Sequence, residues 1–190
     1  MTSTEASADY RHGALRTAAS QGETEHVAAL LDQGADPDGH NRFGTTALHL
    51  ASRNGHLRIV ELLLEHGAAA AHRDNHGNTA AVLATWGGHR EVLQTLLDRA
   101  ADLPEHEKET CLGWAIILAD IPTVELLLEA GADLEIRGRR GWTATEFARH
   151  WYQTGRNGPD EPKYREILTL LGLPAEAPAK PAPRSAIFPR

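Results

Sequence analysis

Histidine is the residue type in this sequence that most readily suggests chemistry. The 190 residues include eleven histidines, and three of them, His66, His72 and His76, fall close together in the chain. Imidazole nitrogens are common zinc ligands, and the four-residue spacing of His72 and His76 is compatible with a shared metal. No companion ligand follows at a typical zinc spacing, so we expect exposed loop histidines and no metal or cofactor. A metal-dependent activity on these loops is the alternative.

Motifs of covalent and phosphate chemistry are absent from the sequence. It contains no glycine-rich phosphate loop, no G-x-S-x-G, no H-E-x-x-H and no pair of cysteines. The one cysteine, Cys111, excludes an internal disulfide. It falls in an apolar segment, where we expect a small buried core residue rather than a nucleophile. We therefore predict that the chain is not an enzyme.

A fixed period runs through the chain. Gly22, Gly55 and Gly88 are 33 residues apart, and so are Gly34 and Gly67. A period of this size is typical of a stacked repeat array. Alignment on the period predicts a repeat domain over residues 9–172, with copies at about residues 9–40, 41–73, 74–106, 107–137 and 138–172.

Each copy has the pattern of two short helices. Apolar residues recur at helical spacing in the second helix, at Val27, Leu30, Leu31, Ile59, Val60, Leu63, Leu64, Val92, Leu96, Leu97, Val124, Leu127 and Leu128. A threonine hydroxyl can accept a backbone N–H where a first helix begins, and this position holds Thr46, Thr79, Thr110 and Thr143. A left-handed glycine can end a second helix, as expected for Gly34, Gly67 and Gly131. One such helix pair cannot bury its apolar face alone, so we expect the copies to stack.

The repeated unit resembles the ankyrin repeat. Residues 46–51 read TALHLA, which is similar to the family signature T-P-L-H-x-A, and Gly55-His56, the helix VELLLEHGA and a closing Gly-Ala-Asp belong to the same pattern. The resemblance covers about residues 10–172. It implies an all-α ankyrin-repeat solenoid of stacked helix-turn-helix units with protruding loops or short β-hairpins. It also implies that His49 helps to hold neighbouring loops by hydrogen bonds.

Some copies depart from this pattern. The first and the fifth are atypical and suit capping repeats at the two ends of an array. In the fourth copy Gly113 replaces the histidine and Ala119 replaces the turn glycine, which predicts a tighter or distorted turn. An insertion at residues 153–162 interrupts the fifth copy, where we expect a surface loop followed by a helix at residues 164–171.

Composition limits the class of partner. A net charge of −7 counts against binding to nucleic acid or to an anionic membrane. The sequence has no stretch of about 18 apolar residues that would span a membrane, and its first residues lack the pattern of a secretory signal. The small, polar residues 1–8 and the Pro/Ala-rich residues 173–190 are expected to be disordered. We expect a cytoplasmic monomer.

The resemblance also places candidate binding residues. Ankyrin folds usually bind partners through the finger loops and the exposed side of the first helices, which line a concave groove. The candidates here are Arg42, Phe43, Arg53, His76, Trp86, Ile117, Leu118, Arg139, Arg140, Trp142, His150 and Trp151. The fourth tryptophan, Trp114, maps to the core.

Alternatives to this surface assignment stay open. Trp142 and Trp151 could instead pack under the insertion, and Trp86 could fill a gap left by Gly87-Gly88. A basic group at Arg137, Arg139, Arg140, Arg149 and Arg156 predicts either an acidic partner segment or a solvated loop.

The function that these features favour is a non-enzymatic protein–protein interaction module, which binds a partner protein through the concave groove and the finger loops. A narrower alternative is a regulatory or inhibitory subunit of an enzyme that also uses the C-terminal tail.

Overall fold

The computed structural model describes residues 3–100, 103, 106–137, 141–154 and 158–174, with only the backbone described for residues 3–11. The chain divides into two compact units, Met1–Pro104 and Glu105–Arg190. The described part is all-α: it holds ten helices and no strand. None of the described helices is long and apolar enough to cross a membrane.

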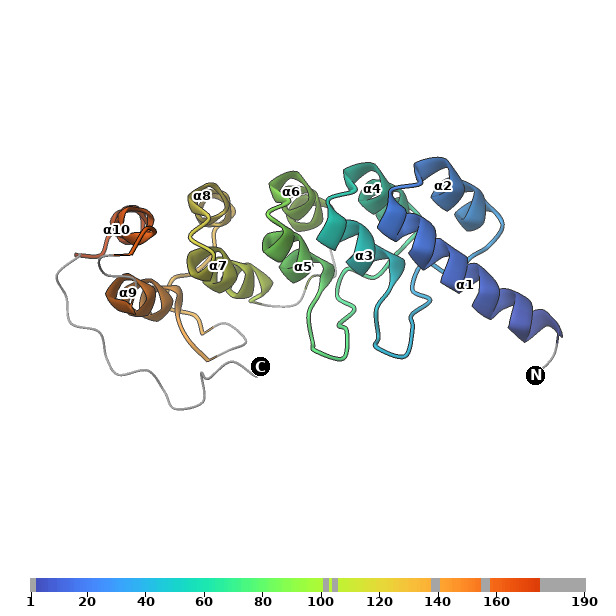
Figure 1. Cartoon of the computed structure of the whole chain (residues 1–190), viewed down its shortest axis with the longest axis horizontal. Helices are drawn as coiled ribbons and strands as arrows, with labels where there is room; N and C mark the ends of the chain where they lie inside the picture. Colours follow the sequence, from blue (N-terminus) through green and yellow to red (C-terminus); the bar gives the residue numbers. More distant parts are fainter. Residues whose placement is uncertain (1–2, 101–102, 104–105, 138–140, 155–157, 175–190) are drawn as a thin grey trace. The chain divides into compact units, whose positions relative to one another are not determined.

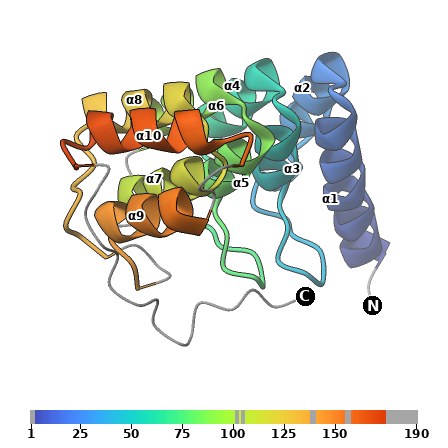
Figure 2. The ribbon, with the colours of Figure 1, turned by 60° about the vertical axis from the view of Figure 1, so that its left-hand side comes forward.

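The first unit is built from two layers of helices. Its elements are α1 (Ser3–Gln21), α2 (Thr24–Asp32), α3 (Ala47–Asn54), α4 (Leu57–Glu65), α5 (Ala80–Gly87) and α6 (Arg90–Arg99). The first layer packs α1 on α3 and α3 on α5, and the second layer packs α2 on α4 and α4 on α6. Figures 1 and 2 show these layers, with the loops that precede α3 and α5 extending past the first layer.

The second unit repeats the same arrangement with fewer helices. It contains α7 (Glu107–Ile117), α8 (Ile121–Glu129), α9 (Ala144–Thr154) and α10 (Glu161–Leu170). Here α7 packs against α8 and α9, and α10 packs against α8 and α9. Its core includes the fully buried Leu112, Ile116, Leu127, Ile167 and Leu168.

The helix boundaries confirm most of the predicted caps. The hydroxyl oxygens of Thr46 and Thr79 accept backbone N–H groups at the starts of α3 and α5, and Thr143 accepts the N–H of Glu146 at the start of α9. The glycines predicted to end second helices, Gly34, Gly67 and Gly131, all have left-handed backbones. The period therefore predicts local geometry as well as the number of copies.

The prediction for Thr110 is wrong. Helix α7 begins three residues earlier, at Glu107, and the hydroxyl of Thr110 donates to the carbonyl of His106 at 3.1 Å from inside the helix. Glu107 and Glu109 occupy the first turn, where carboxylates are favourable against the partial positive charge of a helix start. The two carboxylates therefore favour a helix start that lies before the threonine.

Other details also differ from the sequence-based expectation. Helix α1 begins at Ser3, within residues 1–8, which the composition predicts to be disordered. The protruding segments, expected to be loops or short β-hairpins, are loops, because the described residues form no strand. The expected surface loop at residues 153–162 is shorter, because α9 continues to Thr154 and α10 starts at Glu161. Residues 155–157 of this insertion and residues 175–190 of the tail lie outside the described part.

Ala119 keeps the turn geometry of the glycine that it replaces. In the second copy the N–H of Gly55 bonds to Ser52 and that of His56 to Ala51. In the fourth copy the N–H of Ala119 bonds to Ile116 at 3.1 Å and that of Asp120 to Ala115 at 3.0 Å. The turn is therefore not distorted, but Ala119 adopts a φ of 52°, which costs about 1–2 kcal/mol for a residue with a Cβ.

Replacing Ala119 with glycine should relieve this strain. We expect Ala119→Gly to raise the free energy of unfolding by about 0.5–1 kcal/mol, since part of the relief is offset by the greater freedom of glycine in the unfolded chain. Urea unfolding followed by circular dichroism measures the change. The reverse replacement, Gly88→Ala, is a matched control: the φ there is 70°, and an added Cβ would meet no described atom within 4 Å. It should destabilise by about 1 kcal/mol; a destabilising Ala119→Gly would contradict the assignment of strain.

Candidate functional site

Two finger loops carry part of the candidate site. The first finger, residues 40–45, closes through the side chain of Asn41, whose Oδ1 accepts the N–H groups of Phe43 at 2.9 Å and Thr45 at 3.1 Å. The second finger, residues 73–78, closes in the same way on Asp74, whose Oδ1 accepts from His76 at 2.9 Å and Asn78 at 2.8 Å. Each finger is therefore a turn held by its own polar side chain.

The two fingers are also bonded to each other. The N–H of Asn75 donates to the carbonyl of Phe43 at 2.9 Å, and the Asn75 side chain donates to the carbonyl of Arg42 at 3.0 Å. Gly44 permits this approach, because its φ is 71° and an added Cβ would lie 2.9 Å from Asn75 Oδ1. The backbone that carries Arg42 and Phe43 is thus fixed to the next copy.

His49 links the second finger to the first-layer helix α3. It is 1% exposed, and its Nε2 donates to the carbonyl of Asn78 at 3.1 Å. Its Nδ1 accepts the backbone N–H of Thr46 at 3.3 Å, which completes a reciprocal cap with that threonine. The ring is therefore neutral, with the proton on Nε2, and the hydrogen bond to the neighbouring loop implied by the family resemblance is present.

Burial lowers the pKa of His49 below its ordinary value of 6.5, and the hydrogen bond to Asn78 opposes this shift. The ring of His72 lies edge-on at 5.7 Å between centroids, and its charge would lower the pKa of His49 further. His72 itself donates from Nε2 to the carbonyl of Gly44 at 3.2 Å. Two imidazoles thus bond to the backbone of the two fingers.

A second set of histidines joins the copies at the opposite ends of the first-layer helices. His56 donates from Nε2 to the carbonyl of Ser20 at 3.2 Å, and His89 to the carbonyl of Arg53 at 3.0 Å. The turn glycine of the preceding copy makes room for each ring: a Cβ on Gly55 would lie 2.4 Å from Nδ1 of His89. The ends of α1 and α3 are therefore each held by a histidine of the next copy.

The unit 1 face is our name for the five candidate residues of the first unit: Arg42, Phe43, Arg53, His76 and Trp86. All five are exposed, with Phe43 at 50% and Trp86 at 40%. The guanidinium of Arg42 lies over the Phe43 ring at 4.6 Å from its centroid. Arg53 and Trp86 occupy equivalent positions at the ends of α3 and α5, which pack against each other. The face thus combines two large apolar side chains with two cations.

Candidates in the second unit have mixed positions. Leu118 is 46% exposed at the end of α7, whereas Ile117, His150 and Trp151 are half-buried. Trp114, predicted to be core, is also half-buried. Arg139 and Arg140 lie outside the described residues, as does Arg156.

The expected exposure of Trp142 is wrong. It is 4% exposed, and its ring packs against Phe147 and His150 at 5.1 Å between centroids in each case. The reason lies in the start of α9: Trp142 precedes the capping residue Thr143 and contacts Phe147 in the first turn, which is a hydrophobic staple. The motif W-T-x-x-E-F is visible in the sequence and could have predicted this burial.

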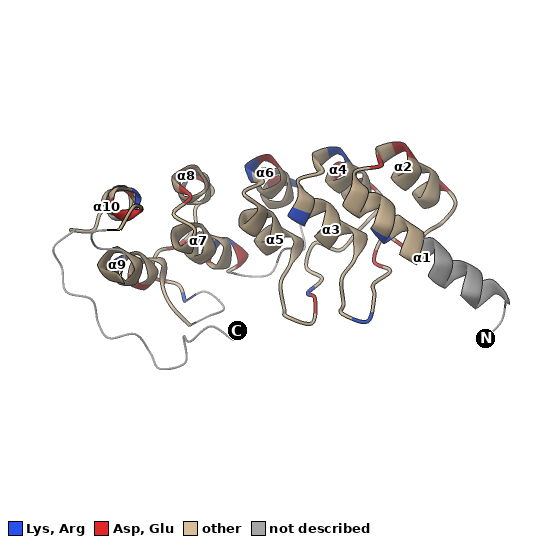
Figure 3. Ribbon diagram, in the orientation of Figure 1, with Lys and Arg blue, Asp and Glu red and all other residues tan. Residues whose placement is uncertain are grey.

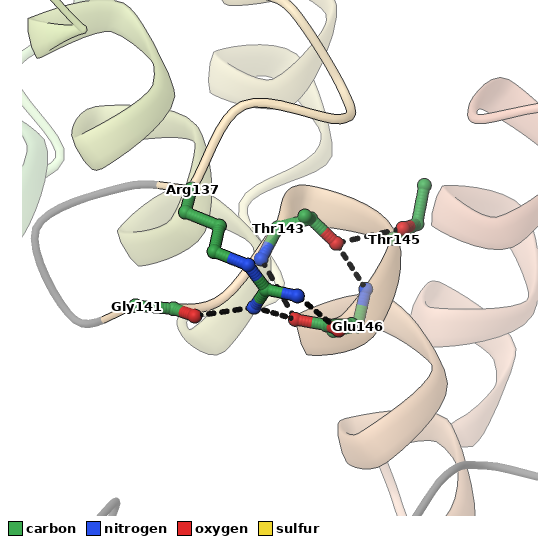
Figure 4. A network of polar contacts seen from close by, with 5 residues as sticks. All are labelled: Arg137, Gly141, Thr143, Thr145 and Glu146. Atoms are coloured by element: carbon green, nitrogen blue, oxygen red, sulfur yellow. Dashed lines mark hydrogen bonds and ion pairs between the residues drawn. The ribbon is translucent and has the colours of Figure 1, made fainter. Parts of the chain in front are cut away.

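Arg137 is exposed but is paired with groups of the same chain. Its guanidinium makes two bonds to the Glu146 carboxylate, at 2.8 and 3.1 Å, and a third to the carbonyl of Gly141 (Figure 4). The same carboxylate accepts the N–H of Thr143 at 3.1 Å. This arginine fixes the start of α9, so it is not a free cation for an acidic partner.

The described residues do not assemble a metal site, because no three His, Cys, Asp or Glu side chains among them are placed to hold one ion. His66 bonds from Nδ1 to the carbonyl of Leu62 at 2.8 Å, and His76 is exposed at the tip of the second finger. Cys111 is fully buried, which confirms its expected place in the core. The hypothesis of a metal-dependent activity gains no support from this geometry.

Comparison with known families decides the assignment of the repeats. Residues 15–107 match a model of ankyrin repeats in three copies. This chain contains ankyrin repeats. The match covers the first unit from Leu15 onward. The two fingers and both sets of joining histidines lie within this segment. Ankyrin repeats generally mediate protein–protein interaction. No curated protein matches the sequence.

The buried His49 should make stability depend on pH. The unfolded chain takes up a proton near pH 6.5, whereas the folded protein resists protonation of His49 until a lower pH. The contribution of its neutral form is therefore complete above about pH 6.5 and decreases as the pH falls below that value. Replacing His49 with glutamine should remove up to about 1.4 kcal/mol per pH unit from the acid-side slope of unfolding free energy. Urea unfolding of both proteins between pH 5 and 8 measures this slope; equal slopes would contradict the assignment.

Proposed function

We propose that the chain is a non-enzymatic protein-interaction module that binds a partner protein through the unit 1 face. One observation carries the proposal: the exposed aromatic ring of Phe43 stands on backbone that is bonded to the next copy, and the exposed ring of Trp86 lies at the end of α5, which packs on α3. Exposed apolar side chains grouped with arginine are typical of interaction surfaces. The expected location in the cytoplasm, the monomeric state and the absence of nucleic-acid binding belong to the same proposal.

Pre-organisation supports binding by this face. The carbonyl of Phe43 accepts from Asn75, and the end of α3 is fixed by the bond from His89 to Arg53. Binding costs free energy for each loop or side chain that becomes ordered. Because much of this backbone is already fixed in the free protein, a larger part of the contact energy remains as affinity.

The polar pair that most resembles catalytic machinery has a structural role. Thr46 Oγ1 lies 2.8 Å from His49 Nδ1, a distance typical of a nucleophile and its general base. Both residues are buried, with 1% of their surface exposed, and the histidine is held by its hydrogen bonds to Asn78 and Thr46. This pair caps a helix and has no access to a substrate.

Removal of the two exposed rings should abolish partner binding without unfolding the protein. We expect the double variant Phe43→Ala, Trp86→Ala to lose at least about 30-fold in affinity, since truncation of an aromatic anchor typically costs 2 kcal/mol or more. Its urea midpoint should stay close to that of the wild type. The measurement is capture of partners from extracts of the native cell, compared quantitatively between the two proteins.

Two controls make the comparison specific. Leu170→Ala removes another exposed apolar side chain, on α10, and should leave capture unchanged. Trp142→Ala should lower the free energy of unfolding by about 3 kcal/mol or more, because its buried ring leaves a cavity. Equal capture by the wild type and by the Phe43, Trp86 double variant would sink the proposal.

A further inference from the structure

Charge is divided between the two layers of the first unit. The first-layer helices α3 and α5 contain no aspartate or glutamate, and neither do residues 12–21 of α1. Their neighbours in the second layer carry Glu25, Asp32, Glu61, Glu65, Glu91 and Asp98. Figure 3 shows α3 and α5 without the red that marks acidic residues, and a blue segment lies at one end of α3; Arg53 is in the last turn of that helix. In a chain with a net charge of −7, these segments of the first layer carry no acidic residue.

The acidic residues near the fingers are already engaged by backbone groups. Asp38 accepts the N–H of Ala69 at 2.9 Å, and Asp74 accepts two N–H groups of its own finger. Asp36 accepts the N–H of Asp38 at 3.0 Å. These carboxylates satisfy turns, so they are not directed to the cations of the unit 1 face.

Two arginines of the second layer form ion pairs with carboxylates. On the second layer, Arg58 pairs with Glu61 at 3.0 Å, and Arg99 lies 3.3 Å from Glu65. Within the described part of the chain, the guanidiniums of Arg42 and Arg53 have no carboxylate within 4.0 Å. Two cations thus remain without acidic partners beside the aromatic rings.

We propose that the occupant of the unit 1 face is an acidic segment of a partner protein that carries an apolar anchor. Its carboxylates pair with Arg42 and Arg53, and its anchor, a leucine, isoleucine or aromatic side chain, packs on Phe43 or Trp86. This inference rests on the proposed function and adds the chemistry of the partner. Guanidinium–carboxylate pairs can form two parallel hydrogen bonds, so they provide orientation as well as attraction.

The spacing of the two arginines limits the length of the segment. Arg42 precedes α3 and Arg53 lies in its last turn, and the eight residues of that helix rise about 12 Å. An extended peptide advances about 3.3 Å per residue, so its two acidic positions are separated by at least about four residues. An uncharged apolar segment would cover the guanidiniums without pairing them, which is unfavourable.

Selection from a random peptide library tests this chemistry directly. The full chain is immobilised, and phage that display random 12-residue peptides are selected on it after depletion on the Phe43→Ala, Trp86→Ala variant. We expect the recovered peptides to be enriched in aspartate and glutamate around a leucine, isoleucine or aromatic residue. Their affinity should fall as salt is raised, because exposed ion pairs are screened.

Charge reversal then tests the two arginines. Arg42→Glu and Arg53→Glu should each weaken a selected acidic peptide by at least about tenfold, which corresponds to the loss of a charge-assisted hydrogen bond. Arg90→Glu, which changes an exposed arginine on the second layer, is the matched control and should have little effect. Retained folding is checked by circular dichroism of each variant.

The possible outcomes distinguish failure of this inference from failure of the proposed function. Enrichment of basic or uncharged peptides that require Phe43 and Trp86 would overturn the acidic occupant and leave the interaction module intact. Recovery of no peptide that depends on these rings would overturn both. A fluorescent single-stranded oligonucleotide serves as the remaining probe: binding at 150 mM salt that is lost in Arg42→Glu and Arg53→Glu would assign the face to nucleic acid and overturn the proposal.

Discussion

The structure depends on one constraint: helices this short cannot bury their apolar faces without a neighbour. Helix α3 has eight residues and α4 has nine, fewer than the 12–15 or so at which an isolated helix becomes even marginally stable. Ile59, Val60 and Leu63 of α4 are nevertheless fully buried, because the adjoining copies cover them. Stability in such an array resides in the interfaces between copies, so the polar joints at those interfaces matter as much as the helices.

The joints lie at both ends of the first-layer helices. At the start of α3, His49 and Asn75 connect one finger with the next copy. At its end, the carbonyl of Arg53 accepts a hydrogen bond from Nε2 of His89. Each bond satisfies a backbone carbonyl that would otherwise depend on water. As a result, side chains on the first finger and at the end of α3 are presented from backbone that is bonded to the next copy, which is what the proposed binding role requires.

Much of this architecture could be predicted from the sequence, because it rests on local rules. A threonine at a helix start and a glycine with positive φ at its end leave recognisable residues at a fixed period, as Thr46 and Gly55 show. The failures have equally local causes. Glu107 and Glu109 start α7 before Thr110, and the staple between Trp142 and Phe147 buries a ring that the family resemblance places on the surface. Of the candidate site, the sequence supplied the exposed Phe43, Arg53 and Trp86.

Apart from the bond of His49 to the neighbouring loop, the sequence did not indicate the polar contacts between copies or those within the charged loops. The pairing of Arg137 with Glu146 joins residues nine positions apart across a loop, and no periodicity predicts it. Likewise, the folding of the fingers directs Asp38 and Asp74 toward backbone N–H groups, so within the described residues neither carboxylate pairs with Arg42. A count of charges along the chain gives the net acidity and does not show how the layers divide it.

The joint between Gly55 and His89 has a consequence for how such an array can grow. The second copy carries both halves of the joint. Its His56 donates to the carbonyl of Ser20 in the preceding copy, and its Gly55 leaves room for the ring of His89 in the following copy. Duplication of the coding segment for residues 41–73 would therefore create a new junction whose two sides already fit. The lengthened protein would keep the glycine–histidine joint at that junction, so copy number can change by whole units while the chemistry of this joint stays constant.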